Sequence, residues 1–168
     1  ETGHTREHLR LEAIAAGKGD RMRSIREIGA AIEAVDPALD PQAAANELLY
    51  LAEAVLEHWV EARGEEPTLE AREGFRLLAL HRQGAKGEPS FNACRETCRE
   101  VCYYYNLVTL QPAHAEITHR SQLMQMVSNH LYLFISGKLE VAGLGEFCCS
   151  SKPIRLASQA DASTHKEA

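Results

Sequence analysis

The feature that most constrains this fold is the spacing of apolar residues, which recur at intervals of three and four along most of the chain. The clearest case is the segment 41–63, where Leu48, Val55 and Trp59 share one face of a predicted helix. An aspartate followed by a proline precedes this segment, in the order that favours the start of a helix. Such three- and four-residue periodicity predicts amphipathic helices rather than strands.

The same reasoning applied along the chain predicts an all-α fold, a bundle of five or six helices. The connections between the predicted helices are short, so some helix pairs should be antiparallel neighbours. The segment 138–147 is ambiguous and predicts a small hairpin or an irregular stretch near the C-terminus, which would make the fold α+β. We predict helices over 5–16, 21–35, 41–63, 69–83, 91–105 and 113–136.

Composition places the chain among ordinary soluble globular proteins. It has 168 residues, of which 45% are hydrophobic and 25% charged, and this suits one domain. We expect a single helical domain over 1–150 and a flexible tail over 151–168, where the sequence is small and polar. The net charge of −6 argues against nucleic acid as a partner. No apolar run approaches the roughly 20 residues needed to span a bilayer, so we expect no membrane segment.

Two observations bear on where the protein resides. The chain has five cysteines, and an odd number leaves at least one unpaired under oxidising conditions, so reduced thiols in the cytoplasm fit better. The first three residues, Glu1, Thr2 and Gly3, are similar to the remnant left by a secretion vector. A secreted location therefore stays open.

The strongest chemical signal is a cysteine column, formed by Cys94, Cys98 and Cys102 at four-residue spacing. At about 100° per residue these positions fall on one face of a continuous helix, together with apolar neighbours. Free cysteine packs well in protein cores, so one interpretation is that the thiols only pack. A second interpretation is a soft-metal or redox site, and a third is a disulfide framework.

Helix geometry limits how the column binds a metal. Cys94 and Cys102 lie about 12 Å apart along the axis and cannot share one zinc ion. A single ion would use Cys98 with one neighbour, whereas a Cu(I) array could use the whole column. The sequence does not determine a cofactor; if the column binds a metal, zinc or copper(I) is expected, and iron less so. The predicted metal ligands are Cys94, Cys98, Cys102, Cys148, Cys149, His119 and His130.

The four-residue cysteine spacing resembles that of the cysteine-lined helical bundles of copper-storage proteins. Those proteins carry the spacing on several helices, whereas here it is confined to residues 91–105. The resemblance covers a small part of the chain, and no function is carried over from it.

Two histidines on predicted helices also have structural interpretations. His130 lies in an apolar stripe and reads first as a core histidine with a hydrogen bond, and second as a ligand. His81 lies near the end of its predicted helix, and we predict that it interacts with the helix dipole. A nucleophilic cysteine would need a base beside it. Arg95 and Arg99 would lower the pKa of a nearby thiol if they bent over it.

An alternative metal centre comes from a Glu-x-x-His pair, Glu116 and His119, which matches the spacing used in di-iron bundles. Carboxylates and an imidazole on another predicted helix, Glu53, Glu57 and His58, would supply the remaining ligands. A complete site needs a second Glu-x-x-His pair, and no second internal pair is present in the chain.

These patterns favour a small helical accessory or regulatory protein that binds partner proteins and a soft metal through the cysteine column. The alternatives are a di-iron-like enzyme or storage protein, and a metal-free interaction module whose cysteines only pack. Whether the protein is an enzyme stays undecided. The run Tyr103, Tyr104 and Tyr105 cannot all face inward, so at least one ring marks a surface for a protein partner or a second copy.

Overall fold

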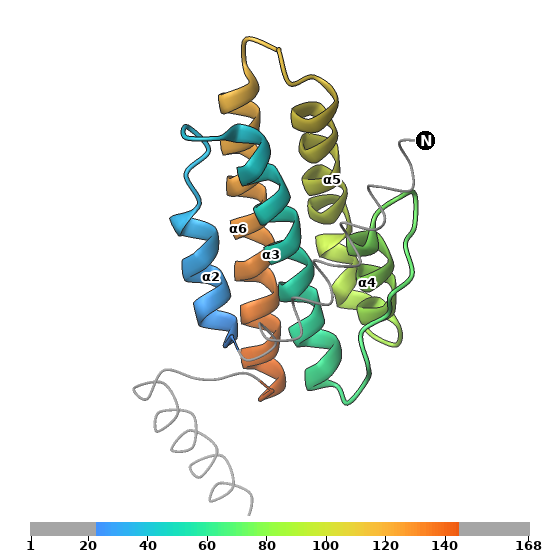
Figure 1. Cartoon of the computed structure of the whole chain (residues 1–168). Coiled ribbons are helices and arrows are strands. Elements are labelled where there is room, and N and C mark those ends of the chain that lie inside the picture. The colour runs from blue at the N-terminus through green and yellow to red at the C-terminus, as the bar shows by residue number, and fades with distance from the viewer. Residues whose placement is uncertain (1–22, 145–168) are drawn as a thin grey trace, which may run out of the picture.

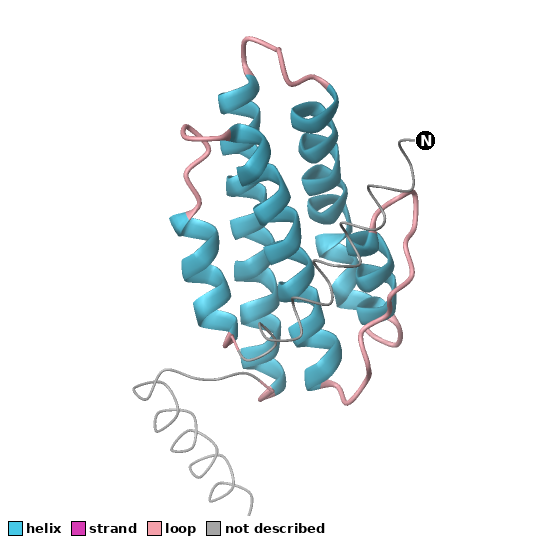
Figure 2. Ribbon diagram, in the orientation of Figure 1, coloured by secondary structure: helices cyan, strands magenta, loops and turns pink. Residues whose placement is uncertain are grey.

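The computed structural model describes residues 23–144, which contain helices and no strand (Figures 1 and 2). The prediction of an all-α bundle is therefore confirmed for this part of the chain. The predicted helix over 5–16, the predicted tail over 151–168, and Cys148 and Cys149 lie outside the described residues. The elements are α2 (Ile25–Ala34), α3 (Pro41–Ala62), α4 (Arg76–Ala85), the 3-10 helix η1 (Pro89–Cys94), α5 (Arg95–Leu110) and α6 (Ile117–Ala142).

Helices α2, α3, α5 and α6 alternate in direction, as Figure 1 shows. The Gln125 side chain of α6 donates hydrogen bonds to the carbonyls of Ile32 (2.8 Å) and Val35 (2.7 Å) at the end of α2, so these two helices are antiparallel. The Ser121 hydroxyl donates to the carbonyl of Pro41 (3.2 Å), which joins the N-terminal ends of α6 and α3. Helices α3 and α6 are therefore parallel, and they pack directly against each other through the middle of the bundle.

Helix α3 is the central element, because it packs against α2, α4, α5 and α6. Its predicted start is confirmed, since the Asp40 carboxylate accepts hydrogen bonds from the backbone of Gln42 (3.1 Å) and Ala43 (3.0 Å), with Pro41 at the first helical position. Such a cap stabilises a helix by about 1 kcal/mol. The predicted inner face is buried along the whole length of the helix, through Leu48, Ala52, Val55, Leu56 and Trp59.

The prediction for the next helix is wrong at its start. Helix α4 begins at Arg76 rather than at residue 69, and an irregular segment precedes it. The Thr68 hydroxyl accepts from the backbone of Glu70 (3.1 Å) in a local turn instead of capping a helix. Glu73 (φ 52°) and Gly74 (φ 82°) then adopt left-handed backbone conformations, which an α-helix cannot include.

Helix α6 differs from its prediction at both ends. It begins at Ile117 rather than 113, and it continues to Ala142 instead of ending near 136. The hairpin predicted from residue 138 is therefore wrong for 138–142. Gly137 lies inside the helix, because an isolated glycine lowers helix stability without ending a helix. Gly143 adopts the left-handed conformation (φ 70°) that ends it.

The buried face of α6 was predicted only in part. Of the residues predicted to share its inner face, Val127 is buried and Leu123 and Phe134 are half-buried, whereas His119, Met126 and His130 are exposed. Apolar residues surround α6 on nearly all sides, so the sequence pattern does not determine which side is buried. The face that packs in the core consists of Ser121, Met124, Val127, Ser128, Leu131, Ile135 and Leu139.

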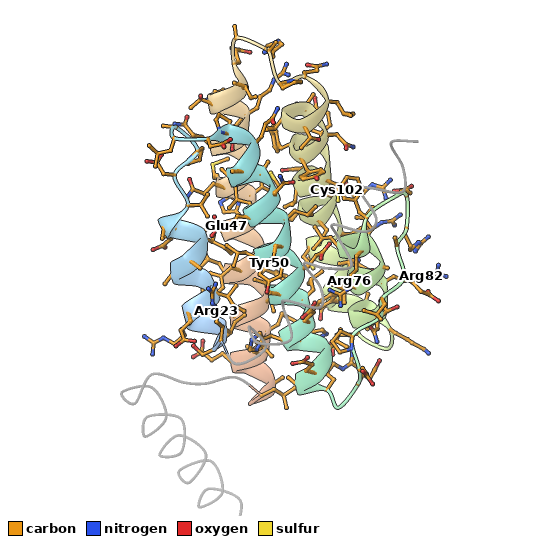
Figure 3. All side chains as sticks on the ribbon, in the orientation of Figure 1. Arg23, Glu47, Tyr50, Arg76, Arg82 and Cys102 are labelled. Atoms are coloured by element: carbon orange, nitrogen blue, oxygen red, sulfur yellow. The ribbon has the colours of Figure 1, made fainter. Side chains whose placement is uncertain are left out.

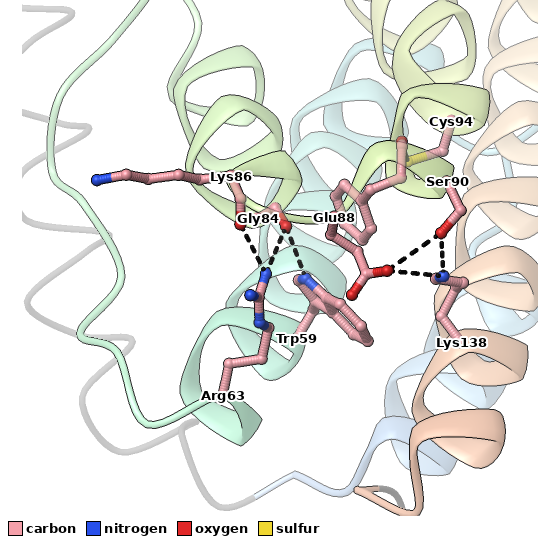
Figure 4. Close-up of polar contacts among 9 residues, drawn as sticks. Trp59, Arg63, Gly84, Lys86, Glu88, Ser90, Cys94 and Lys138 are labelled. Atoms are coloured by element: carbon pink, nitrogen blue, oxygen red, sulfur yellow. Dashed lines mark hydrogen bonds and ion pairs between the residues drawn. The ribbon is translucent and has the colours of Figure 1, made fainter.

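A close contact at the far end of α3 positions the segment that carries the first cysteine (Figure 4). The indole of Trp59 and the guanidinium of Arg63 both donate to the carbonyl of Gly84, at 3.0 and 3.1 Å. The Phe91 ring stacks on Trp59 with 5.2 Å between ring centroids. A β-carbon at Gly84 would lie 2.9 Å from both rings, so only glycine fits here.

We expect Gly84→Ala to lower the free energy of unfolding by about 1–3 kcal/mol, because neither ring can move away in the packed core. Gly137→Ala is the matched control, since no atom lies within 4 Å of its added β-carbon. It should raise stability by about 0.5–1 kcal/mol through the better helix propensity of alanine. Chemical denaturation of both variants measures the difference, and equal changes of the same sign would contradict the packing.

Candidate thiol site

All three thiols of the cysteine column are buried and form no disulfide. The exposed fractions of Cys94, Cys98 and Cys102 are 1%, 0% and 5%, so the prediction that the sulfurs point into the interior is confirmed. The column does not lie on one continuous α-helix, however. Cys94 ends η1 and occupies the N-cap position of α5, with φ −93° and ψ 4°.

A histidine from α4 completes the cluster around Cys94. His81 is buried (6% exposed), and its ring stacks on the Phe91 ring at 5.3 Å between centroids. Its Nε2 atom lies 3.1 Å from the Phe91 carbonyl oxygen, and the Sγ of Cys94 lies 3.2 Å from the same oxygen. A carbonyl only accepts, so Nε2 carries the proton in this hydrogen bond. One carbonyl thus brings an imidazole and a thiol together.

The electrostatics of the cluster favour a thiolate at Cys94. A hydrogen bond from the Cys98 thiol lowers the pKa of Cys94 most, burial opposes this, and the hydrogen bond and charge of His81 lower it further, to about 6. The same hydrogen bond raises the pKa of Cys98 well above its ordinary value, with burial and the charges of Cys94 and Cys102 acting in the same direction. The two pKa shifts run in opposite directions, which favours the thiolate at Cys94 and the protonated thiol at Cys98.

The pKa of the His81 imidazole depends on the same neighbouring groups. Burial lowers the pKa of His81, but its hydrogen bonds to Cys94 and to the Phe91 carbonyl outweigh burial, and the net pKa is raised. The sequence indicated that a nucleophilic cysteine would need a base beside it. It did not identify His81 as that base, because His81 was predicted to be a partner of the helix dipole. Its position four residues after Leu77 and three before Gly84, both buried, is the sequence signal that would have placed it on the inner face.

The arginines expected to activate a thiol lie elsewhere. Arg99 forms an exposed ion pair with Glu73, with 3.2 Å between Nη2 and Oε2. Arg95 is exposed, and its charge acts on the pKa of His81, which it lowers slightly. The low pKa of Cys94 therefore comes from the neighbouring thiol and from an imidazole on another helix.

The two predicted histidine ligands are not brought to this cluster. His119 and His130 are exposed on α6, and Cys148 and Cys149 lie outside the described residues. Within residues 23–144 no three side chains of His, Cys, Asp or Glu are arranged to hold a metal ion together.

The alternative di-iron ligands are also separated. Glu53 and Glu57 both pair with the buried guanidinium of Arg76, labelled in Figure 3 where α4 meets α3. Arg76 Nε also donates to the Thr68 carbonyl (2.8 Å), so this group fixes the irregular segment before α4 against α3. Glu116 lies at the start of α6, beside the start of α3, and Glu53 is about 18 Å farther along α3.

No family model, curated protein or solved structure matches this chain. None of the helices within 23–144 combines the length and the apolar character needed to cross a membrane. Residues 23–144 thus form an all-α bundle with a buried thiol–imidazole cluster.

We expect one thiolate of the folded protein to appear with a pKa of about 6 when its ultraviolet absorbance is followed against pH. Above this pKa Cys94 is charged, and below it the thiol is neutral. Cys98→Ala should move the step toward the ordinary cysteine value, because the strongest hydrogen-bond donor is lost. Cys98→Ser keeps a donor and should retain part of the shift. Cys94→Ser should remove the step, and its persistence there would assign it to another group.

Proposed function

We propose that this protein is a helical metal-binding module that holds one Cu(I) ion between the Sγ atoms of Cys94 and Cys98. The observation that carries the proposal is that two buried thiols four residues apart lie beside a buried imidazole, with Cys94 and His81 both meeting the Phe91 carbonyl. Two neighbouring sulfurs that hold one proton between them can instead hold a soft monovalent cation with two ligands.

Charge balance favours a monovalent ion over zinc. When Cu(I) binds, the proton held by Cys98 leaves, so one positive charge replaces another and the net charge of the buried cluster is unchanged. Zn²⁺ would add a charge to an apolar interior, where an uncompensated charge is costly. Zinc also takes four ligands in structural sites. Thiolate ligands are those that select Cu(I) among common metals.

His81 is a positioning residue in this proposal. Its hydrogen bond and charge favour the thiolate form of Cys94, and metals bind the thiolate rather than the thiol. Because the ring is stacked on Phe91 and hydrogen bonded to its carbonyl, the imidazole is held in one orientation. Groups that orient a metal ligand in this way typically change metal affinity by about 10- to 100-fold when removed.

Cys94 is carried by η1, whose surface contacts hold it against α6. This element is a six-residue 3-10 helix, and hydrogen-bond geometry in such helices is poorer than in α-helices. It is fastened to α6 by Lys138, whose Nζ contacts the Ser90 hydroxyl and the Glu88 carboxylate (Figure 4). Both contacts are partly exposed, whereas the Phe91 ring of the same element is fully buried, so exposure of Cys94 would require this ring to leave the core.

Copper binding is tested by titrating reduced protein with Cu(I) against a chromogenic Cu(I) chelator such as bathocuproine disulfonate. The background is the full chain with Cys148→Ser and Cys149→Ser, which removes the two cysteines that lie outside the described residues. We expect one tightly bound ion per chain. Cys94→Ser and Cys98→Ser should lose it, and His81→Ala should weaken it by about 10- to 100-fold.

Cys102→Ser is the matched control, because it removes a buried thiol of the same column outside the proposed pair. It should keep the ion, and X-ray absorption of the loaded protein should show sulfur ligation. Equal affinity in all four variants, or no uptake by folded protein, would leave the cysteines as core residues. Iron that survives Cys98→Ser would instead favour the di-iron alternative.

A further inference from the structure

Element η1 is held in the bundle by two side chains. Of its six residues only Phe91 and Cys94 are buried, and the other four are exposed. In a 3-10 helix, residues three positions apart lie on the same face, one above the other. The Phe91 ring and the Cys94 thiol therefore enter the core side by side, and a displacement of η1 withdraws both of them.

The contacts of Phe91 are lost together when its ring leaves the core. The ring stacks on Trp59 of α3 and on His81 of α4, and it packs edge-to-face on Phe134 of α6. The carbonyl oxygen of the same residue lies 3.1 Å from Nε2 of His81. Because a packed core favours discrete arrangements over gradual deformation, we expect η1 to have a closed state and an open state without stable positions between them.

The chain that leads into η1 is suited to act as a hinge. The guanidinium of Arg63 fixes the end of α4, because it donates to the carbonyls of Gly84 (3.1 Å) and Lys86 (3.2 Å). The next residue, Gly87, is exposed and has a φ of 73°, a conformation that glycine adopts without strain. The segment after Gly87 can therefore change direction while α4 stays in place.

Lys138 of α6 makes the surface contacts that oppose this movement. Its Nζ atom contacts the Ser90 hydroxyl and the Glu88 carboxylate, the latter at 3.7 Å (Figure 4). The side chains of Lys138 and Glu88 are 22% and 34% exposed, and ion pairs near the surface stabilise a structure only weakly. The buried ring therefore supplies most of the resistance to opening, and Lys138 adjusts it.

We propose that η1 is a gate, an element that must be displaced before a solute can reach the Cys94 thiol. The structure shows the closed state. In the open state, residues 88–94 rotate about Gly87 and withdraw the Phe91 ring, while Cys98 stays buried on α5. Opening costs less free energy than unfolding of the bundle, because η1 buries two side chains whereas every described α-helix buries four or more. This proposal concerns the accessibility of the thiol and stands without the copper proposal.

Alkylation by N-ethylmaleimide measures opening of the gate in the metal-free protein. The full chain carries Cys148→Ser and Cys149→Ser, and peptide mass spectrometry follows the labelling of each remaining cysteine. Cys94 should be labelled at least about tenfold faster than Cys98 and Cys102, with a weak dependence on urea because opening exposes little surface. Equal rates with equal urea dependence at all three thiols, or labelling of Cys94 as fast as in unfolded protein, would overturn the gate.

Lys138→Met tests the surface contacts, because methionine keeps most of the apolar stem and lacks the ammonium group. It should speed the labelling of Cys94 about two- to fivefold, measured relative to Cys98, which reports the stability of the whole bundle. Arg99→Met is the matched control, since it removes an exposed ion pair with Glu73 away from η1. It should leave the ratio of the two labelling rates unchanged. The same ratio in both variants would contradict the role of Lys138.

A consequence for copper rests on the proposed function. An ion between Cys94 and Cys98 enters and leaves only when η1 opens, so Lys138→Met should raise the rates of Cu(I) uptake and release by the same factor, about two- to fivefold, and leave the dissociation constant unchanged. Stopped-flow transfer of Cu(I) to and from bathocuproine disulfonate measures both rates. Unchanged rates would show a route that avoids η1 and would overturn the gate. A chain that binds no Cu(I) but shows the labelling pattern would retain the gate and contradict the copper proposal alone.

Discussion

The backbone and ring of Phe91 together join the core of this protein to its thiol cluster. The ring is fully buried, and it stacks on Trp59 and His81 and packs edge-to-face on Phe134. The carbonyl of the same residue meets both His81 and Cys94. Because α3, α4 and α6 all hold this ring, the carbonyl cannot turn away, and the imidazole and the thiol are kept together by packing. The site therefore depends on the core rather than on a flexible loop.

The parts of the fold that could be predicted from the sequence are those where several local signals agree. Helix α3 has a capping aspartate, a proline at its first position and one apolar stripe, and it was predicted nearly to the residue. Helix α4 was predicted seven residues too early, because the left-handed Glu73 is not signalled by its residue type. The buried side of α6 was predicted only in part because both of its sides are apolar, and only the arrangement of neighbouring helices distinguishes them.

The candidate site was predicted only where its residues lie on one helix. Four-residue spacing was enough to place Cys98 and Cys102 on one buried face, since a helix fixes that relation locally. It could not show that Cys94 lies where a 3-10 helix meets an α-helix. The partner histidine is 13 positions away in sequence, and its proximity to Cys94 results from how α4 packs against η1. Spacing within one segment carries no information on such a contact.

Filling a core with this cluster is less favourable in free energy than filling it with apolar side chains. A buried imidazole costs free energy unless it is hydrogen bonded, and His81 needs both the Phe91 carbonyl and Cys94 for this. Apolar side chains of similar volume would fill the same space without that requirement, and buried polar groups replaced in this way often leave a protein equally or more stable. Three thiols with an imidazole supply what apolar side chains cannot, namely a thiolate beside a protonated thiol and a charge held in the interior. This cost supports the proposal that the cluster binds a metal ion.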